Sequence, residues 1–118
     1  MTRPVVYLGA DHNGFRLKEQ LKPWLAAQGV KFRDAGAHRM VRQDDYPTYA
    51  AAVARAVAAG LGEGLLICGS GHGMAITANR FRHVRAALCA TPASAANARR
   101  DDFANVLVLA AWHNTLPH

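Results

Sequence analysis

Short apolar runs alternate along this chain with amphipathic or alanine-rich stretches, and this alternation constrains its fold more than any other feature. The runs are typical of buried strands, and the spacing within the longer stretches is typical of helices. Strands are predicted at 5–9, 30–32, 65–67, 84–88 and 106–110, with helices around 17–25, 45–60, 73–79 and 91–99 between them. The alternation predicts an α/β fold with a mostly parallel sheet of about five strands and helices on both faces.

Two prolines bear on the predicted helix boundaries. Pro23 lies inside the first helix, and because proline lacks a backbone N–H we expect a kink or an early end there. Pro47 lies in the first turn of the second helix, so the Asp45 side chain is predicted to cap that helix. Lys18 is expected to lie off the apolar face of the first helix.

Length and charge limit the class of protein. At 118 residues the chain is expected to be a single domain spanning 1–118. A formal net charge of +6 favours anionic ligands. The 14 basic residues are scattered, apart from a cluster at Arg80, Arg82 and Arg85, and no nucleic-acid-binding motif accompanies them. A small phosphorylated substrate explains the charge at least as well, so no nucleic-acid partner is expected.

No segment has the pattern of a membrane span or a secretion signal. No apolar run approaches the roughly 20 residues needed to cross a bilayer, and residues 1–4 lead directly into a predicted strand. The two cysteines, Cys68 and Cys89, are not spaced like a metal site. We therefore expect a cytoplasmic protein without membrane association, bound metal or disulfide.

The segment 65–74 carries the strongest chemical signal. An apolar run ends at Cys68, and Gly69, Gly71 and Gly73 follow. Glycines let backbone N–H groups turn toward an anion, and a helix starting near Gly73 adds a favourable dipole. These features are expected to expose Cys68 and lower its pKa, which suits proton transfer next to a carbonyl. A buried structural cysteine remains an open alternative for Cys68 and is favoured for Cys89.

Other polar residues lie at predicted strand or helix ends. Asp11 and His12 follow the first strand, at the edge where ligands bind in such folds, and suit sugar binding or proton shuttling. Asp11 is equally explained as a turn or helix cap. His72 lies inside the glycine loop and is predicted to project toward ligand or solvent. Residues 99–102 are most simply a solvated helix end, with a weaker claim on a substrate.

These motifs together resemble the family of ribose-5-phosphate isomerase B and galactose-6-phosphate isomerase. The resemblance covers nearly the whole chain and rests on the order and spacing of segments that are each weak alone. The matching segments are 9–18, 45–47, 67–74, 78–80, 84–89 and 104–107.

The resemblance implies a Rossmann-like three-layer sandwich and a homodimer with shared active sites. It also implies aldose–ketose isomerisation of a sugar phosphate without metal or cofactor, most directly of ribose 5-phosphate in the pentose phosphate pathway. Cys68 matches the family base, the amides of 69–73 match its anion hole, and Ser70 matches its hydroxyl residue. The other positions implied to contact or support the substrate site are Asp11, His12, Tyr46, Gly69, Gly71, His72, Gly73 and Asn79.

The chain departs from the family pattern at one end of the expected pocket. Asp101 and Asp102 stand at the positions of the ring-opening histidine and its neighbouring asparagine, so ring opening would fall to Asp101 and substrate contact to Asp102. Trp112 replaces an arginine that often binds phosphate, and the sequence ends before a long helix that carries further arginines and dimer contacts. His72 stands where an apolar or amide residue is usual. The basic residues left to hold a phosphate are Arg80, Arg99 and Arg100.

A metal-free isomerase with Cys68 as its base is the favoured interpretation. One alternative is an isomerase for a different or unphosphorylated sugar, with the pocket reshaped at Asp101, Asp102 and Trp112. Another is a non-catalytic relative, either a sugar-binding module or the partner subunit of a mixed complex.

Overall fold

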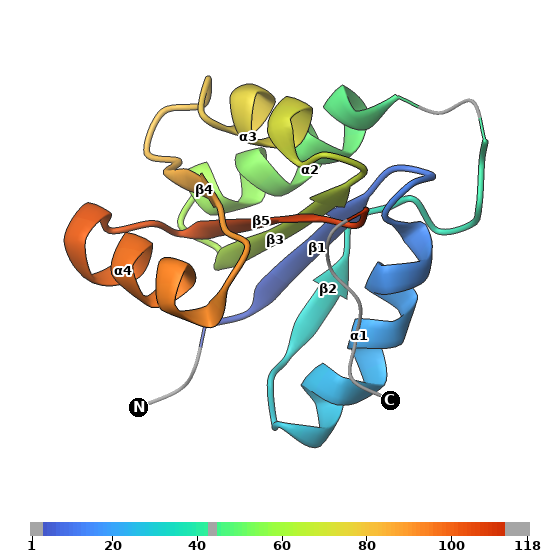
Figure 1. Ribbon diagram of the computed structural model, residues 1–118, viewed down its shortest axis with the longest axis horizontal. Helices are drawn as coiled ribbons and strands as arrows, with labels where there is room; N and C mark the ends of the chain where they lie inside the picture. Colours follow the sequence, from blue (N-terminus) through green and yellow to red (C-terminus); the bar gives the residue numbers. More distant parts are fainter. Residues whose placement is uncertain (1–3, 43–44, 113–118) are drawn as a thin grey trace.

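The described part of the computed structural model, residues 4–42 and 45–112, contains one sheet of five parallel strands connected by four helices (Figure 1). The elements follow in the order β1 (Val6–Ala10), α1 (Phe15–Ala27), β2 (Phe32–Asp34), α2 (Tyr46–Ala58), β3 (Glu63–Cys68), α3 (His72–Ala78), β4 (Ala86–Leu88), α4 (Pro92–Asp102) and β5 (Val106–Ala110). The predicted α/β fold with about five parallel strands is confirmed. None of the described helices combines the length and apolar composition that a membrane span needs.

The strand order places a candidate binding edge at the centre of the sheet. The strands lie in the order β2-β1-β3-β5-β4, so the chain moves to one side after β1 and to the other side after β3. In such sheets ligands bind beyond the carboxyl ends of the strands, where the direction reverses. Here that point lies between the ends of β1 and β3, which are followed by Asp11 and by the glycine loop.

Helices cover both faces of the sheet (Figure 1). α2 and α3 pack on one face, where Val53, Leu66 and Met74 are fully buried. α1 and α4 lie on the other face, where Leu21 and Ile67 are buried. Burying a side chain of this size stabilises the fold by about 1.5–3 kcal/mol. Alternate residues of β3 therefore point into two different cores.

The structure differs from two local expectations about the helix ends. α1 continues through Pro23 to Ala27, so the early end does not occur. The apolar face formed by Leu17, Leu21 and Leu25 stays packed against the sheet, which offsets the hydrogen bond that proline cannot make. α2 begins at Tyr46 as predicted, but the Asp45 side chain makes no capping hydrogen bond.

Candidate active site

Cys68 ends β3 and lies in the core beneath α2 and α3, with only 5% of its surface exposed. Its Sγ accepts a hydrogen bond from the backbone N–H of Gly71 at 3.2 Å. Burial raises the pKa of the thiol above its ordinary value of 9.0, and the negative charge of Asp11 acts in the same direction. The N–H groups of Met74, Gly71 and Ser70 oppose this shift. The expected exposed thiol with a lowered pKa is therefore wrong, because the core that holds Cys68 removes water from it.

Each glycine of the loop is covered by a side chain from a different element. A Cβ added at Gly69 would lie 2.5 Å from Cε2 and Cζ2 of Trp112. A Cβ at Gly73 would lie 2.5 Å from Cζ of Tyr46. Gly71 has a left-handed backbone, with φ +83, and a Cβ there would collide with Leu88. The loop thus keeps its backbone close to three apolar or aromatic walls, which only glycine permits.

Asp11 lies beside the thiol and also shapes the turn after β1. Its Oδ1 accepts hydrogen bonds from the N–H groups of Asn13 at 3.0 Å and Gly14 at 3.1 Å. Gly14 packs so closely on the backbone of Ile67 that a Cβ would clash with the Ile67 carbonyl. Asp11 is thereby buried next to the end of β3, followed by the half-buried His12. The turn-forming alternative for Asp11 is confirmed, and it places the carboxylate near Cys68.

Ser70 and His72 complete the loop that leads into α3. The Ser70 hydroxyl accepts a hydrogen bond from the His72 N–H at 3.3 Å, which fixes the turn before the helix. Ser70 is half-buried and His72 is exposed. The fold therefore gathers the following predicted site residues at one edge of the sheet: Asp11, His12, Tyr46, Cys68, Gly69, Ser70, Gly71, His72 and Gly73.

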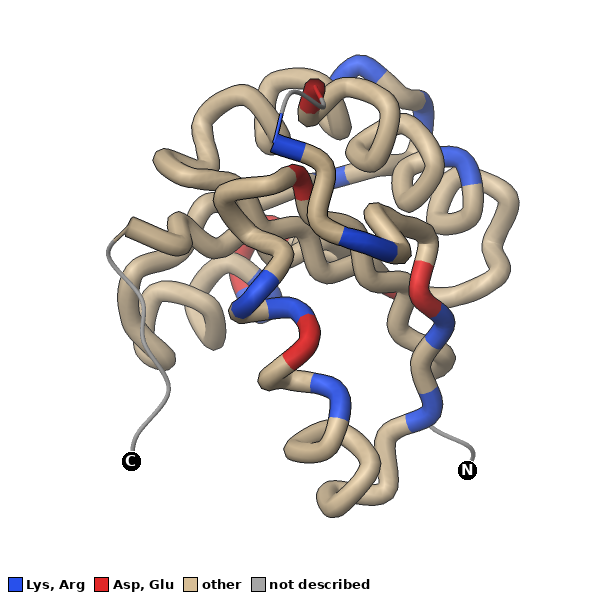
Figure 2. Tube along the Cα trace, turned by 90° about the vertical axis from the view of Figure 1, so that its right-hand side faces the viewer, with Lys and Arg blue, Asp and Glu red and all other residues tan. Residues whose placement is uncertain are grey.

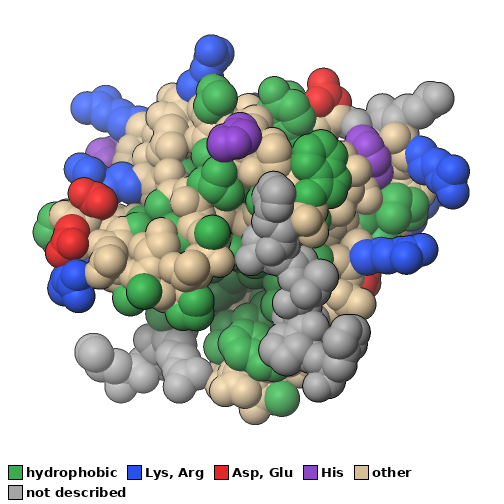
Figure 3. Space-filling model, viewed as in Figure 1, with side chains coloured by type: hydrophobic (Ala, Val, Ile, Leu, Met, Phe, Trp, Pro, Cys, Tyr) green, Lys and Arg blue, Asp and Glu red, His purple; other side chains and the backbone are tan. Residues whose placement is uncertain are grey.

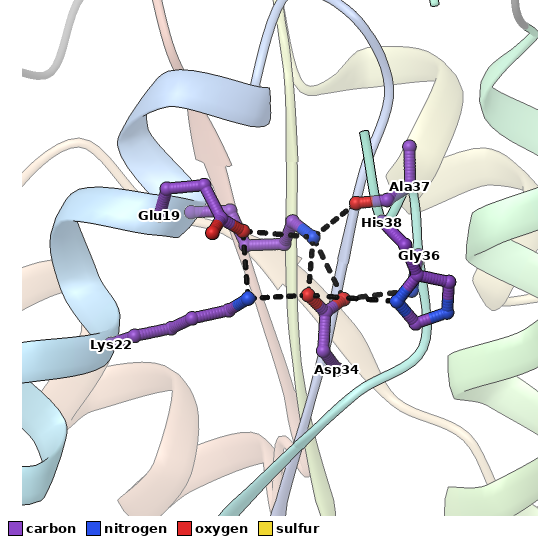
Figure 4. A network of polar contacts seen from close by, with 7 residues as sticks. Glu19, Lys22, Asp34, Gly36, Ala37 and His38 are labelled. Atoms are coloured by element: carbon purple, nitrogen blue, oxygen red, sulfur yellow. Dashed lines mark hydrogen bonds and ion pairs between the residues drawn. The ribbon is translucent and has the colours of Figure 1, made fainter. Parts of the chain in front are cut away.

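A buried ionic cluster beside this edge was missed by the sequence analysis. Lys18, expected off the apolar face of α1, is fully buried. Its Nζ donates to both carboxylate oxygens of Asp34, at 2.7 and 2.8 Å, and to the Ala37 carbonyl (Figure 4). Lys22 also binds Asp34, at 2.6 Å, and Glu19, at 2.8 Å. The only sequence signal was the position of Lys18 next to Leu17, at the border of the buried stripe.

The ionic cluster holds the segment after β2 against the end of β1. Ala10 donates its N–H to the Gly36 carbonyl, and its own carbonyl accepts from Ala37, both at 2.9 Å. Burial alone would raise the pKa of Asp34, but hydrogen bonds from Lys18 and Lys22 lower it to about 2. The cluster thus fixes the backbone that precedes Asp11.

Figure 2, with the α1 side toward the viewer, shows acidic and basic residues interspersed rather than gathered into one basic face.

Four predicted site residues lie elsewhere. Arg100, Asp101 and Asp102 are in the last turn of α4, where Arg100 binds Asp101 at 3.0 Å and Asn97 at 2.6 Å. The preceding Arg99 forms an ion pair with Glu63, the first residue of β3. Cys68 is five positions further along that strand, or about 16 Å away at roughly 3.3 Å per residue. Asp101 and Asp102 therefore lie near the opposite edge of the sheet within one chain.

Asn79 is the fourth of these residues and joins α3 to β4. Its side chain donates to the Ala86 carbonyl at 2.9 Å and accepts from the Ala86 N–H at 2.8 Å. Both polar ends of the side chain are therefore engaged by the start of β4. Asn79 therefore supports the start of β4, away from the glycine loop, and not the loop that the resemblance implied.

An apolar cavity lies on the face of the sheet that α1 and α4 cover. It encloses about 510 Å³ between α1 and α4, and is lined by Trp24, Leu65, Leu107, Leu109 and Cys89. In Figure 3 hydrophobic side chains gather in the hollow between these two helices. Cys89 is buried here as a small apolar side chain, and the cavity does not include the Cys68 loop.

Within residues 4–42 and 45–112, no three His, Cys, Asp or Glu side chains are grouped to hold a metal ion.

The fold and site define an α/β protein in which a cysteine ends a central parallel strand and faces a loop of backbone donors beside a carboxylate. The chain belongs to the ribose/galactose isomerase family, whose model matches residues 6–116. It is an enzyme of the isomerase class.

Comparisons with individual proteins agree with this assignment. The chain is 44% identical over 103 residues to ribose-5-phosphate isomerase B of Escherichia coli strain K12, covering 86% of this chain and 68% of the relative. It is 37% identical over 108 residues to a 4-deoxy-4-sulfo-D-erythrose isomerase of Clostridium sp. strain MSTE9, covering 91% and 68%. The crystal structure of ribose-5-phosphate isomerase B from Mycoplasma genitalium with bound ribulose 5-phosphate superposes with a TM-score of 0.92 at 34% identity, covering 98% and 77%. For the Thermotoga maritima enzyme the TM-score is 0.91 at 37% identity, covering 97% and 79%.

Proposed function

We propose that this sugar-phosphate isomerase interconverts ribose 5-phosphate and ribulose 5-phosphate, with Cys68 as the base. The observation that carries the proposal is the hydrogen bond from Gly71 to the Cys68 sulfur within a loop of backbone donors. The 44% identical relative from Escherichia coli carries the same activity in its name. The proposal places the enzyme in the cytoplasm and in the pentose phosphate pathway.

The proposed reaction moves one proton from C2 to C1 and a second from the C2 oxygen to the C1 oxygen, and it shifts the carbonyl double bond from C1 to C2. The Cys68 thiolate removes the proton from C2 of the open-chain aldose, and the C–H electron pair forms the C1–C2 double bond while the C1 carbonyl oxygen becomes an enediolate oxygen. N–H groups of the 69–73 loop stabilise that charge, often the largest single contribution to such catalysis. The Cys68 thiol, after partial exchange of its proton with solvent, then protonates C1. The proton of the C2 hydroxyl passes to the C1 oxygen, which leaves the ketone at C2. Ser70, Asp11, His12 and Tyr46 would hold the sugar hydroxyls.

The raised pKa of Cys68 is compatible with this role. A base taken out of water holds a proton more strongly, so its thiolate is scarcer at neutral pH but more reactive toward a weak carbon acid. Substrate binding also brings a carbonyl next to the same N–H groups. The reaction therefore needs the buried sulfur and the loop donors together.

A second copy of the chain completes the proposed site. Asp101, the proposed ring-opening residue, lies near the opposite edge of the sheet from Cys68 in its own chain. We infer a homodimer in which α4 of one copy brings Asp101 and Asp102 to the glycine loop of the other, with Arg100 available for the phosphate. Each site would then combine Cys68 from one copy with Asp101 from its partner copy.

A changed sugar is the second candidate function. It is favoured by the 37% identity to an isomerase named for a sulfonated four-carbon sugar, and by Trp112 beside the glycine loop. In that case the proton transfer at Cys68 is unchanged, and the length of the carbon chain and its terminal group differ. The third possibility, a sugar-binding or partner subunit, predicts binding without turnover.

Kinetics of two cysteine variants test the proposal. Cys68→Ala is expected to lower kcat for ribose 5-phosphate at least 1000-fold, on the order of what loss of a positioned base costs, while leaving the circular dichroism spectrum unchanged. Cys89→Ala removes the other buried thiol, on the opposite sheet face, and is expected to keep kcat within about threefold. Comparable kcat in both variants would eliminate Cys68 as the base.

A further inference from the structure

Trp112 is fixed to the backbone of the loop that holds Cys68. Trp112 is the second residue after β5, and its N–H donates to the Gly69 carbonyl at 3.1 Å. The preceding Ala111 donates to the Cys68 carbonyl at 2.8 Å. Its indole lies against Gly69, so closely that a Cβ at Gly69 would be 2.5 Å from two ring atoms. The backbone of Trp112 is thus tied to the start of the loop, and its indole packs on Gly69.

Most of this indole remains open to solvent. Trp112 is 67% exposed, although large aromatic side chains are usually well buried. Leu88, the last residue of β4, covers Gly71 in the same loop and is 36% exposed. Exposed apolar surface beside a binding site is surface that a ligand or a partner protein can cover. The exposed face of the Trp112 ring is available to a ligand bound at the 69–73 loop next to Cys68.

We propose that Trp112 determines substrate specificity by stacking its indole on the carbon chain of the sugar, an inference that rests on the isomerase function proposed above. The C–H groups along one side of an open-chain sugar form an apolar strip, and an aromatic face packs on such a strip. An indole carries no charge that pairs with a phosphate. The β5 side of the site therefore selects the carbon backbone of a small aldose or ketose, and the phosphate lies away from Trp112.

Steady-state kinetics with ribose 5-phosphate separate this role from a purely structural one. Trp112→Ala is expected to raise KM about tenfold, as the loss of one aromatic stacking contact predicts, with kcat changed less than about threefold. Trp112→Phe keeps an aromatic face and is expected to hold KM within about threefold. Trp24→Phe is the control, because Trp24 is 54% exposed but lines the cavity between α1 and α4. Unchanged KM in Trp112→Ala overturns the inference, as does an equal rise in Trp24→Phe.

Fluorescence provides a readout that does not need turnover. The chain has two tryptophans, so Trp112 is the only one left in Trp24→Phe. Adding ribose 5-phosphate is expected to shift or quench this emission in a saturable way. Saturable quenching without turnover contradicts the isomerase function and supports the stacking contact; turnover without quenching contradicts the stacking contact alone. If Trp112→Ala changes the sedimentation coefficient and not KM, Trp112 belongs to an interface and the inference is wrong.

Discussion

The backbone N–H of Gly71 donates to Sγ of Cys68 over 3.2 Å, and it does so from a left-handed conformation with φ +83. The bend at Gly71 turns the chain back over the sulfur and starts α3 one residue later. One glycine therefore creates both the donor to the thiol and the entry into the helix. The left-handed backbone of Gly71 and the hydrogen bonding of the Cys68 sulfur therefore depend on each other.

Replacing Gly71 tests that coupling. Gly71→Ala is expected to lower kcat/KM at least tenfold, because the new Cβ collides with Leu88 and displaces the donor to Cys68. Gly60→Ala is the matched control, since Gly60 has a similar φ of +78 but no atom within 4 Å of an added Cβ. Both variants should lose about 1–2 kcal/mol of unfolding free energy from the left-handed alanine. Equal catalytic activity in the two variants would contradict the coupling.

The pH dependence of kcat/KM tests the state of the thiol. Because burial raises the pKa of Cys68 above 9.0 and the thiolate is the proposed base, kcat/KM should still rise as the pH passes this ordinary value. The slope should approach tenfold per pH unit below the thiol pKa. Initial rates between about pH 6 and about pH 10 measure it. A plateau reached near neutral pH would show that another group, or an unperturbed thiol, acts as the base.

The ionic cluster around Lys18 predicts an acid-sensitive contribution to stability. The pKa of Asp34 falls from 3.8 to about 2 on folding, so its contribution is present above pH 3.8 and is lost as the pH falls toward 2. Asp34→Asn is expected to lower the unfolding free energy at neutral pH by about 2 kcal/mol and to flatten its decline below pH 4. Asp45→Asn, at an exposed carboxylate without a capping bond, is the control. Urea unfolding at pH 7 and at about pH 3 measures both; an identical pH profile in Asp34→Asn and the native chain would contradict the assignment.

Subunit complementation tests the shared site. Cys68→Ala and Asp101→Asn are each expected to be nearly inactive, but a mixed dimer would contain one site with both groups intact. Random pairing of co-expressed variants makes about half of the dimers mixed, which restores about one quarter of the native activity. Activity no greater than the sum of the two variants would show that Cys68 and Asp101 do not act in one shared site.

The sheet and helices were predictable because their signals are local: period, glycine and proline positions, and apolar runs. The site was partly predictable for the same reason, since Asp11 and the glycine loop each follow a strand directly. The burial of Lys18 was not, because it depends on Asp34, sixteen positions away, and on the Ala37 carbonyl. The predicted lowering of the Cys68 pKa was also wrong. The glycines indicate backbone donors near the sulfur, but they do not show that the folded core buries it. Tyr46 and Trp112 meet the loop only in the folded chain.

Solvent deuterium exchange followed by NMR tests the central claim most directly. Ribose 5-phosphate or ribulose 5-phosphate is incubated in deuterated water with the native chain, Cys68→Ala and Cys89→Ala. We expect deuterium at C2 of the aldose and C1 of the ketose with the native chain and Cys89→Ala, and none above background with Cys68→Ala. Exchange at the native rate in Cys68→Ala would contradict proton transfer by Cys68.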